Sequence, residues 1–309
     1  MKNLMIRSLA NRVITMMTLA FIFTFVSAAS AQTSATATQA AIQDKTATVY
    51  GVKIRYQEAG NGPAVILLHG LGVDSSSWQM NIAALAQKYR VIAPDQIGFG
   101  KSDKPFINYR VGTLVDFLNG LMKELKVERA SLVGNSLGGF TAAAFALAYP
   151  DKVDKLVLVD AAGYAAPKDI DPRTFNVLNP STREGVKQVM SLVFYDKQRF
   201  ANDAAVDLLY TRKMQVGDGY TVQMFIESIL RGEDVLDGKL DKIKQPTLLV
   251  WGREDMLTPL AMGERFNKDI KGSQLFILEK CGHVPQMEKA AEFNAAVLKF
   301  LGSGNLAEK

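Results

Sequence analysis

The stretch from Arg129 to Pro150 constrains the fold more than any other part of this 309-residue chain. It begins with a short apolar run, Ala130 to Val133, which is typical of a buried strand. It ends in an Ala-rich segment that favours a helix packed closely on a sheet. Between the two lies Gly134-Asn135-Ser136-Leu137-Gly138, a G-x-S-x-G sequence. The pattern predicts a strand, a sharp turn and a helix, with Ser136 at the tip of the turn.

A turn this tight crowds the backbone, and Gly134 and Gly138 lack the side chains that would collide there. The start of the helix directs free N–H groups and a partial positive charge toward any group bonded to the Ser136 hydroxyl. A nucleophile that attacks a carbonyl carbon needs this arrangement. The alternative is a glycine-rich turn in which the serine has no chemical role.

The first residues of the chain have the three parts of a secretory signal peptide. These are a basic segment without acids, an apolar run too short to span a bilayer comfortably, and a small-residue cleavage site: Lys2, Arg7 and Arg12, then residues 13–26, then Ala29-Ser30-Ala31. We therefore expect a signal peptide over residues 1–31, a flexible mature N-terminus over residues 32–44, and a periplasmic or secreted protein. An uncleaved membrane anchor is the alternative.

The charge of the chain excludes two classes of partner. The net charge is +5, and the predicted signal peptide carries three of the basic side chains, so the mature protein is near neutrality. Such a charge gives no basis for binding nucleic acid or an anionic membrane. The single cysteine, Cys281, excludes an intrachain disulfide, which is compatible with the bacterial periplasm. We expect Cys281 to be buried and inert, with a thiol nucleophile as the alternative.

Short apolar runs alternate with helical segments, which predicts a mostly parallel sheet covered by helices on both faces. After a hairpin over residues 46–58, the expected strands are residues 64–68, 90–94, 130–133, 156–159, 247–251 and 274–278. Residues 165–244 break this rhythm, because their apolar residues recur at helical spacing. We predict a helical cap there, inserted between a first core segment over residues 45–164 and a second over residues 245–309.

A serine hydroxyl becomes a good nucleophile only when a base takes its proton. The chain has two histidines, His69 and His283, and both follow predicted strands. Loops after the carboxyl ends of parallel strands gather at one edge of the sheet, so both are expected near Ser136. His69-Gly70-Leu71-Gly72 fits a loop that supplies backbone donors, which leaves His283 as the base. The alternative for His283 is a hydrogen-bonded loop histidine.

The base needs a carboxylate that holds its tautomer and stabilises the imidazolium. The segment after the strand at residues 247–251 offers Glu254 and Asp255, and we choose Asp255. The alternatives for Asp255 are a solvated turn carboxylate or a cap for the helix that starts at Pro259. Asp160, which ends the preceding strand, is the second choice of acid.

An oxyanion that forms on attack needs hydrogen-bond donors. We expect these to be the backbone N–H groups of Leu137, which follows the nucleophile, and of Leu71. No metal or organic cofactor is expected.

Five segments, in this order, resemble the α/β-hydrolase superfamily over residues 45–303. They are His69-Gly70-Leu71-Gly72, residues 95–102, residues 134–139, residues 251–255 and Gly282-His283. The resemblance implies an α/β-hydrolase fold, with an eight-stranded, mostly parallel sheet flanked by helices and an inserted helical lid above Ser136. Because the nucleophile position holds serine and not aspartate, an alkyl-enzyme route is not expected.

Two groups of the superfamily are similar to this chain: the carboxylesterases and lipases, and the meta-cleavage-product hydrolases, which split carbon–carbon bonds. Asn135, the stretch from Ser191 to Asp196, and Arg212, near a substrate-binding arginine, are similar to the second group. The chain departs from that group at Gly72-Val73-Asp74, where the group has Gly-Pro-Gly, and at Val284, where the group has Trp. A secretion signal is also unusual for an intracellular ring-degradation enzyme.

We therefore expect a secreted or periplasmic serine hydrolase that cleaves small carboxylic esters with an apolar acyl part through an acyl-enzyme. A carbon–carbon hydrolase is the first alternative, and a non-catalytic ligand-binding protein on the same fold is the second. The residues expected to contact substrate are His69, Gly70, Asn135, Arg212 and Val284.

Two of these expectations have structural alternatives. Arg212 could instead be a cap surface residue paired with a carboxylate. Four methionines could line an acyl pocket or simply fill the core: Met190, Met224, Met256 and Met287.

Overall fold

The computed structural model describes residues 41–167, 169 and 171–303. The predicted signal peptide, and residues 32–40 of the predicted flexible segment, lie outside these residues. The expected start of the core at residue 45 is slightly wrong, because strand β1 begins at Gln43 and Asp44 already pairs with Arg55. None of the helices in the described part of the chain combines the length and apolar character that crossing a membrane requires.

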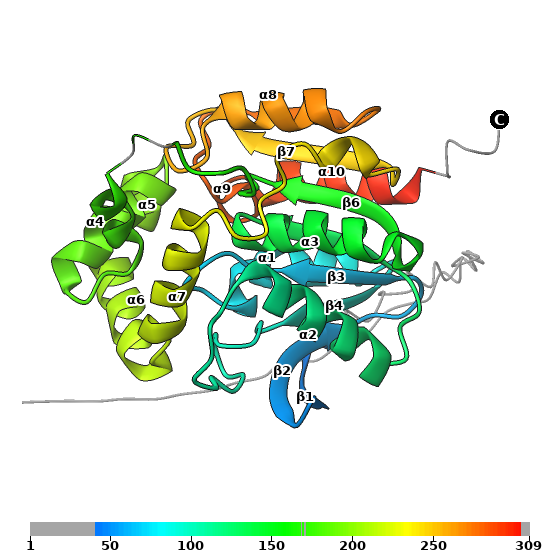
Figure 1. Ribbon diagram of the computed structural model, residues 1–309, viewed down its shortest axis with the longest axis horizontal. Coiled ribbons are helices and arrows are strands. Elements are labelled where there is room, and N and C mark those ends of the chain that lie inside the picture. Colours follow the sequence, from blue (N-terminus) through cyan, green and yellow to red (C-terminus); the bar gives the residue numbers. More distant parts are fainter. Residues whose placement is uncertain (1–40, 168, 170, 304–309) are drawn as a thin grey trace, which may run out of the picture. The chain divides into compact units, whose positions relative to one another are not determined.

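The described residues form one eight-stranded sheet in the order β1-β2-β4-β3-β5-β6-β7-β8 (Figure 1). The strands are β1 Gln43–Val49, β2 Val52–Ala59, β3 Ala64–Leu68, β4 Arg90–Pro94, β5 Ala130–Asn135, β6 Val153–Val159, β7 Thr247–Gly252 and β8 Gln274–Leu278. The β1–β2 and β2–β4 pairs are antiparallel, and the other five pairs are parallel. The expected mostly parallel sheet is confirmed.

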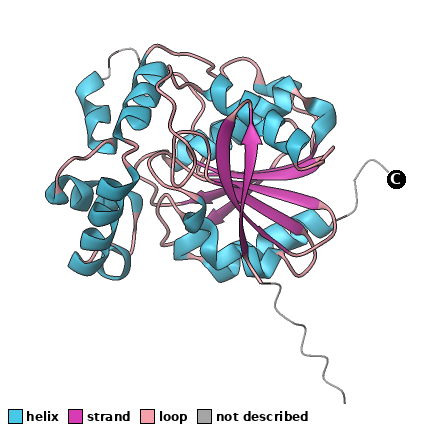
Figure 2. Ribbon diagram, turned by 90° about the horizontal axis from the view of Figure 1, so that it is seen from below, coloured by secondary structure: helices cyan, strands magenta, loops and turns pink. Residues whose placement is uncertain are grey.

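Helices cover both faces of the sheet (Figure 2). Successive side chains of a strand point to opposite faces, so Ile66 and Leu68 of β3 enter one core while Val65 and Leu67 enter the other. The first core also takes side chains of α2 Val111–Glu124, α3 Leu137–Ala148 and α8 Leu260–Asp269, and the second takes those of α1 Gln79–Leu85 and α10 Ala290–Gly302. Burial on both faces explains the continuous apolar runs of the central strands.

Short elements connect these layers. They are the 3-10 turns η1 Ser75–Trp78, η2 Pro150–Lys152 and η4 Leu240–Lys242, and the single-turn helix α9 Pro285–Glu288. Helix α9 begins at Pro285 and is a separate turn before the final helix α10.

Between β6 and β7 the chain forms the cap (left in Figure 1): η3 Pro172–Leu178, α4 Arg183–Val193, α5 Lys197–Phe200, α6 Asp203–Val216 and α7 Gly219–Leu230. Helices α4 and α6 enclose a small core of their own, made of Val186, Met190, Ala201 and Val206. Helix α7 instead buries Val222, Phe225 and Ile226 in the core on the α2–α3 face of the sheet. The cap is thus fastened to the sheet through α7.

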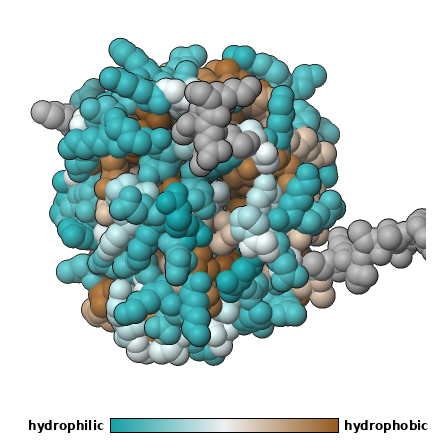
Figure 3. All heavy atoms as spheres, turned by 90° about the vertical axis from the view of Figure 1, so that its right-hand side faces the viewer, coloured by the Kyte–Doolittle hydropathy of each residue, from teal (hydrophilic) through white to brown (hydrophobic). Residues whose placement is uncertain are grey.

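The face of the molecule on the right of Figure 1 is mostly hydrophilic, and its apolar atoms form separate small patches among polar side chains (Figure 3). In open α/β sheets, ligands bind at the carboxyl ends of the parallel strands, which here point toward the cap (Figure 1).

Candidate active site

Ser136 occupies the strained turn between β5 and α3. Its backbone has φ 54° and ψ −116°, a conformation that a residue with a side chain rarely adopts. A Cβ atom on Gly134 would lie 2.2 Å from the carbonyl oxygen of Gly138, and one on Gly138 would lie 2.1 Å from that of Leu68. The two glycines therefore permit the turn, and Ser136 remains partly exposed while its neighbours are buried.

His283 follows β8, and its Nδ1 atom lies 2.8 Å from Oδ2 of Asp255. Both side chains are almost completely buried. An imidazole whose Nδ1–H donates to a carboxylate presents Nε2 as a base, which is the arrangement that nucleophilic catalysis by serine requires.

Four donors hold the Asp255 carboxylate. Oδ1 accepts the backbone N–H groups of Leu257 (2.8 Å) and Thr258 (3.1 Å), and Oδ2 accepts the Thr258 hydroxyl (2.6 Å) in addition to His283. Burial alone would raise the pKa of Asp255, but the nearby His283 and these hydrogen bonds outweigh it and lower the pKa. The carboxylate is therefore ionised. Thr258, which sequence reasoning missed, is part of this arrangement.

Asn135 ties the serine turn to the histidine loop. Its Nδ2 donates to the carbonyl oxygens of His283 (3.0 Å) and Val159 (3.2 Å). The segment carrying Ser136 and the segment carrying His283 are thus held together by a buried amide.

Two backbone N–H groups flank the serine. Leu137 is the first residue of α3, so its N–H has no acceptor within the helix. The His69–Leu71 loop runs beside Ser136: a Cβ atom on Gly70 would lie only 3.4 Å from Cβ of Ser136. Leu71 lines the adjacent pocket. The geometry is compatible with an oxyanion site formed by Leu71 and Leu137.

The expectation that the His69 side chain contacts substrate is wrong. The ring is fully buried, its Nδ1 donates to the carbonyl of Gly70 (2.8 Å), and its Nε2 accepts the backbone N–H of Gln96 (2.9 Å). Burial lowers the pKa of His69, so the ring is neutral. The ring holds the backbone of the loop at Gly70 through its hydrogen bond and does not line the pocket.

Asp160, the second choice of acid, lies next to Asp255. Ligand-type atoms of Asp160, Asp255 and His283 all lie within 4.8 Å of one another, and among the described residues this is the one cluster with a spacing that could hold a metal ion. Because Asp255 and His283 bond directly to each other, the cluster has the geometry of an acid–base pair with an additional carboxyl group.

The cap reaches the histidine loop directly. The backbone N–H of His283 donates to the carbonyl of Val193 at the end of α4 (2.7 Å). Glu288, also missed from the sequence, accepts the N–H groups of Gly282 (2.8 Å), Tyr195 (2.9 Å) and Asp196 (3.0 Å). One buried carboxylate therefore holds the loop before His283 and the segment after α4 together.

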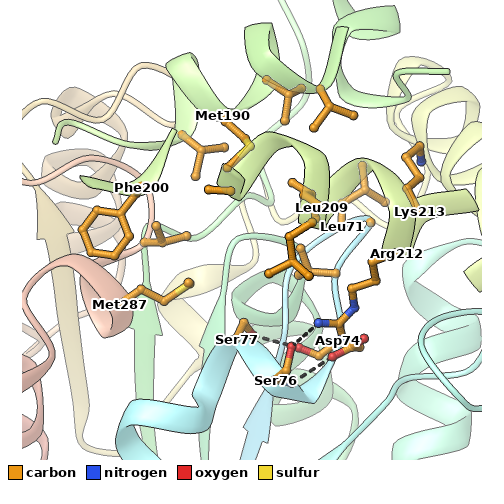
Figure 4. A pocket seen from close by; sticks show the side chains of 18 of the residues that line it. Leu71, Asp74, Ser76, Ser77, Met190, Phe200, Leu209, Arg212, Lys213 and Met287 are labelled. Atoms are coloured by element: carbon orange, nitrogen blue, oxygen red, sulfur yellow. Dashed lines mark hydrogen bonds and ion pairs between the residues drawn. The ribbon is translucent and has the colours of Figure 1, made fainter. Parts of the chain in front are cut away.

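A pocket of about 380 Å³ lies between the cap and the sheet (Figure 4). Leu71, Asn135 and Val284 contribute to its wall beside Ser136 and His283, although neither Ser136 nor His283 lines it. One end is apolar, with Met190, Phe200 and Met287, and the other carries Arg212, Asp74 and Ser76 (Figure 4). Of the four methionines expected, Met224 packs against the core and Met256 is exposed, so neither lines the pocket.

For Arg212 the structure confirms the expected pairing with a carboxylate, and its contact with substrate stays a prediction. Arg212 lines the pocket, and its guanidinium also pairs with Asp74 and donates to the Ser76 hydroxyl (2.8 Å). The thiol of Cys281 is fully buried, and burial raises its pKa, so it is not a nucleophile.

The family model of the alpha/beta hydrolase fold matches residues 63–211 and 229–290. The chain belongs to the α/β-hydrolase family. It is accordingly a hydrolase, and the resemblance read from its motifs is confirmed.

This α/β hydrolase is similar to several curated and solved proteins. It is 34% identical over 264 residues to a 2-hydroxy-6-oxo-6-phenylhexa-2,4-dienoate hydrolase of Comamonas testosteroni. This match covers 80% of this chain and 91% of the relative. The chain is 33% identical over 273 residues to a 2-hydroxy-6-oxononadienedioate/2-hydroxy-6-oxononatrienedioate hydrolase of Burkholderia vietnamiensis, covering 81% and 91%. A crystal structure of a meta-cleavage product hydrolase from Pseudomonas fluorescens IP01 superposes with a TM-score of 0.76 at 33% identity, covering 83% of this chain and 97% of that one.

These relatives overturn the expectation of a carboxylesterase, whereas a periplasmic or secreted location stays a prediction. They carry the names of the group that was the alternative. Gly72-Val73-Asp74 and Val284, the two departures from that group, do not exclude the chain from similarity to it. A short local motif can differ while most of the chain remains similar.

Proposed function

We propose that this hydrolase cleaves a carbon–carbon bond in a 2-hydroxy-6-oxohexa-2,4-dienoate with an apolar group at carbon 6. The observation that carries the proposal is the 33–34% identity to hydrolases named for this substrate class over four fifths of the chain. The lining of the pocket supports it, since a polar end that carries Arg212 and an apolar end suit a molecule with a carboxylate at one end and an apolar group at the other.

The side chains at the apolar end of the pocket favour an apolar group at carbon 6 over a second carboxylate. Arg212 is paired with Asp74 and Lys213 with Asp218, while Arg199 has no acidic partner among the described residues. The lining therefore has a single excess positive charge. The Arg199 guanidinium that carries this charge lies over the Phe200 ring, 4.7 Å from the ring centroid. A 6-phenyl or 6-alkyl group would pack among Met190, Phe194 and Phe200.

The reaction uses the three residues described above. His283 takes the proton of Ser136, whose oxygen attacks the ketone carbon at position 6, and the N–H groups of Leu71 and Leu137 hold the resulting oxyanion. Because carbon 5 of the dienol is trigonal, cleavage requires the 2-oxo tautomer, in which the 2-hydroxyl proton has moved to carbon 5. When the bond between carbons 5 and 6 of this tautomer breaks, its electron pair is delocalised through carbons 4 and 3 onto the 2-oxo oxygen, which receives the proton from His283. Water, deprotonated by the same base, then releases the carboxylic acid from Ser136.

The test is turnover of 2-hydroxy-6-oxo-6-phenylhexa-2,4-dienoate, followed by loss of its absorbance and by chromatography of the benzoate formed. We expect turnover faster than that of the nonadienedioate, and a loss of about 10⁴-fold or more in Ser136→Ala. If Ser136 reacts with a fluorophosphonate while neither dienoate is turned over, the proposal is wrong.

The role of Arg212 gives a second expected outcome. Arg212→Leu removes the cation proposed to meet the substrate carboxylate, so kcat/KM for the phenyl substrate should fall by about 10- to 100-fold, as expected for a hydrogen bond to a charged group. The matched control is Arg231→Leu, because Arg231 pairs with Glu233 at the end of α7 and does not line the pocket. An equal loss with an uncharged p-nitrophenyl ester would contradict the role in carboxylate binding.

A further inference from the structure

Asp160 is a buried acid for which the reaction above has no use. It ends β6, is fully buried, and has a backbone φ of +42°. One carboxyl oxygen, Oδ1, accepts the backbone N–H of Gly252 (2.9 Å). The other, Oδ2, has no donor among the described residues. An ionised carboxylate left half-satisfied in the interior is strongly disfavoured.

The position of Asp160 is fixed by its backbone. Its N–H donates to the carbonyl of Val250 on β7 (3.0 Å), and its carbonyl lies 3.0 Å from the Thr258 hydroxyl. The side chain is therefore held beside Asp255, and one carboxyl oxygen of each residue lies within 4.8 Å of the other. Two buried carboxyl groups this close are not both ionised, so one of them carries a proton.

The surroundings decide which of the two carries it. Asp255 accepts four hydrogen bonds from Leu257, Thr258 and His283, whereas Asp160 accepts one from Gly252. Asp255, the carboxylate that accepts more hydrogen bonds, keeps the negative charge, and the proton stays on Asp160.

We propose that Asp160 is a positioning residue that remains a neutral carboxylic acid and donates its O–H to Asp255, fixing the carboxylate that orients His283. This inference depends on Ser136, His283 and Asp255 acting together, but not on which bond of a substrate is cleaved.

The electrostatics of the site agree with this assignment. Burial, followed by the charge of Asp255, raises the pKa of Asp160 well above its usual range. The other titratable groups facing Asp160 are His283, Glu288 and the Cys281 thiol, of which Glu288 raises the pKa further. A neutral acid beside an ionised one is a known way to supply a hydrogen-bond donor at neutral pH.

The rate at which a fluorophosphonate labels Ser136 tests the proposal, because labelling needs the base but no particular substrate. In Asp160→Asn the amide oxygen can accept from Gly252 and the amide nitrogen can donate to Asp255. Labelling should therefore stay within about threefold of wild type, while Asp160→Leu, which has no donor, should slow it by about tenfold or more. Asp255→Asn provides the rate expected when the orienting carboxylate itself is lost.

The pH dependence of unfolding provides a readout that a purely structural role would not alter. An aspartate in the unfolded chain has a pKa of about 3.9, and that of Asp160 in the folded protein is higher. Its contribution to stability is therefore fully present below the unfolded pKa and is lost as the pH rises through the folded pKa. Thermal unfolding should show Asp160→Asn gaining stability over wild type as the pH rises.

Each result decides the question. If Asp160→Asn labels as slowly as Asp255→Asn, or loses stability relative to wild type with rising pH, Asp160 is ionised and the proposal fails. Should Asp160→Leu not unfold cooperatively, the comparison of Asp160→Asn with wild type on both readouts still decides. Failure to turn over either dienoate would overturn the proposed substrate and leave this result unaffected.

Discussion

At the scale of single residues, the donors around Asp255 determine how His283 is held. Motif spacing was enough to select Asp255 and His283, because each follows a strand that ends at the same edge of the sheet. The same reasoning was wrong for His69, since a histidine at the end of a strand reads the same whether its ring faces a ligand or the interior. Thr258 was missed because a threonine before proline has no pattern of its own.

Replacing Thr258 with valine keeps a similar shape and removes the 2.6 Å hydrogen bond to Oδ2 of Asp255. We expect kcat to fall by about tenfold with KM unchanged, since the net loss of such a bond is about 1.5 kcal/mol. The control is Thr247→Val, because the hydroxyl of Thr247 is also buried but bonds to Gln245 at the far end of β7. Steady-state kinetics of both variants measure the effect. An equal loss of kcat in the two variants would show that the effect is not specific to the bond with Asp255.

At the scale of elements, the strands were the most predictable part of the fold. The runs at residues 64–68 and 90–94 coincide with β3 and β4, because side chains buried on both faces leave an apolar run. The run at residues 274–278 coincides with β8, an edge strand whose residues are mostly only partly buried. The ends of β5 and β7 were predicted too short, since Asn135 and Gly252 continue the backbone pairing with residues that apolar patterns do not detect.

The serine turn makes a strict demand on its glycines. Gly134→Ala would place a methyl group 2.2 Å from the carbonyl oxygen of Gly138. Relieving that contact must move the start of α3, so we expect a loss of about 2 kcal/mol or more in the free energy of unfolding. Denaturant unfolding measures it.

Gly219→Ala is the matched control for this prediction, because a Cβ atom at this first position of α7 meets nothing closer than 3.9 Å. A loss in Gly134→Ala no larger than that of the control would contradict the steric interpretation.

At the scale of the whole molecule, the cap and the sheet meet at the histidine loop. Glu288 bridges them by accepting from Gly282 on one side and from Tyr195 and Asp196 on the other. Sequence patterns located a helical segment between β6 and β7 but could not show this bridge, because it depends on how an inserted unit folds back over a loop about 90 residues later.

Glu288→Gln replaces one of the two accepting oxygens with a donor that faces backbone N–H groups. We expect amide hydrogens of residues 194–196 to exchange faster and the protein to lose about 1–3 kcal/mol of stability. Glu279→Gln is the control, since that exposed carboxylate pairs only with Arg253 among the described residues. Unchanged exchange at residues 194–196 would show that the bridge does not hold the cap.

The function was harder to predict than the fold. Ester and carbon–carbon hydrolysis can begin with the same serine, histidine and aspartate, so the motifs that identify the family do not separate the two reactions. The separation depends on which charged and apolar groups the cap presents to the pocket, and periodicity could not place Arg212, Asp74 or Phe200 in space.

The cap leaves the sheet after β6 and returns at β7, and these two strands are direct neighbours with Val159 paired to Val250. Asp160 and Asp255 follow these strands, so the distance between the two acids is set by the ladder and not by the 80 or so residues inserted between them. Selection could therefore lengthen, shorten or exchange that insertion, and with it the molecules admitted, while the chemistry beneath stays as it is.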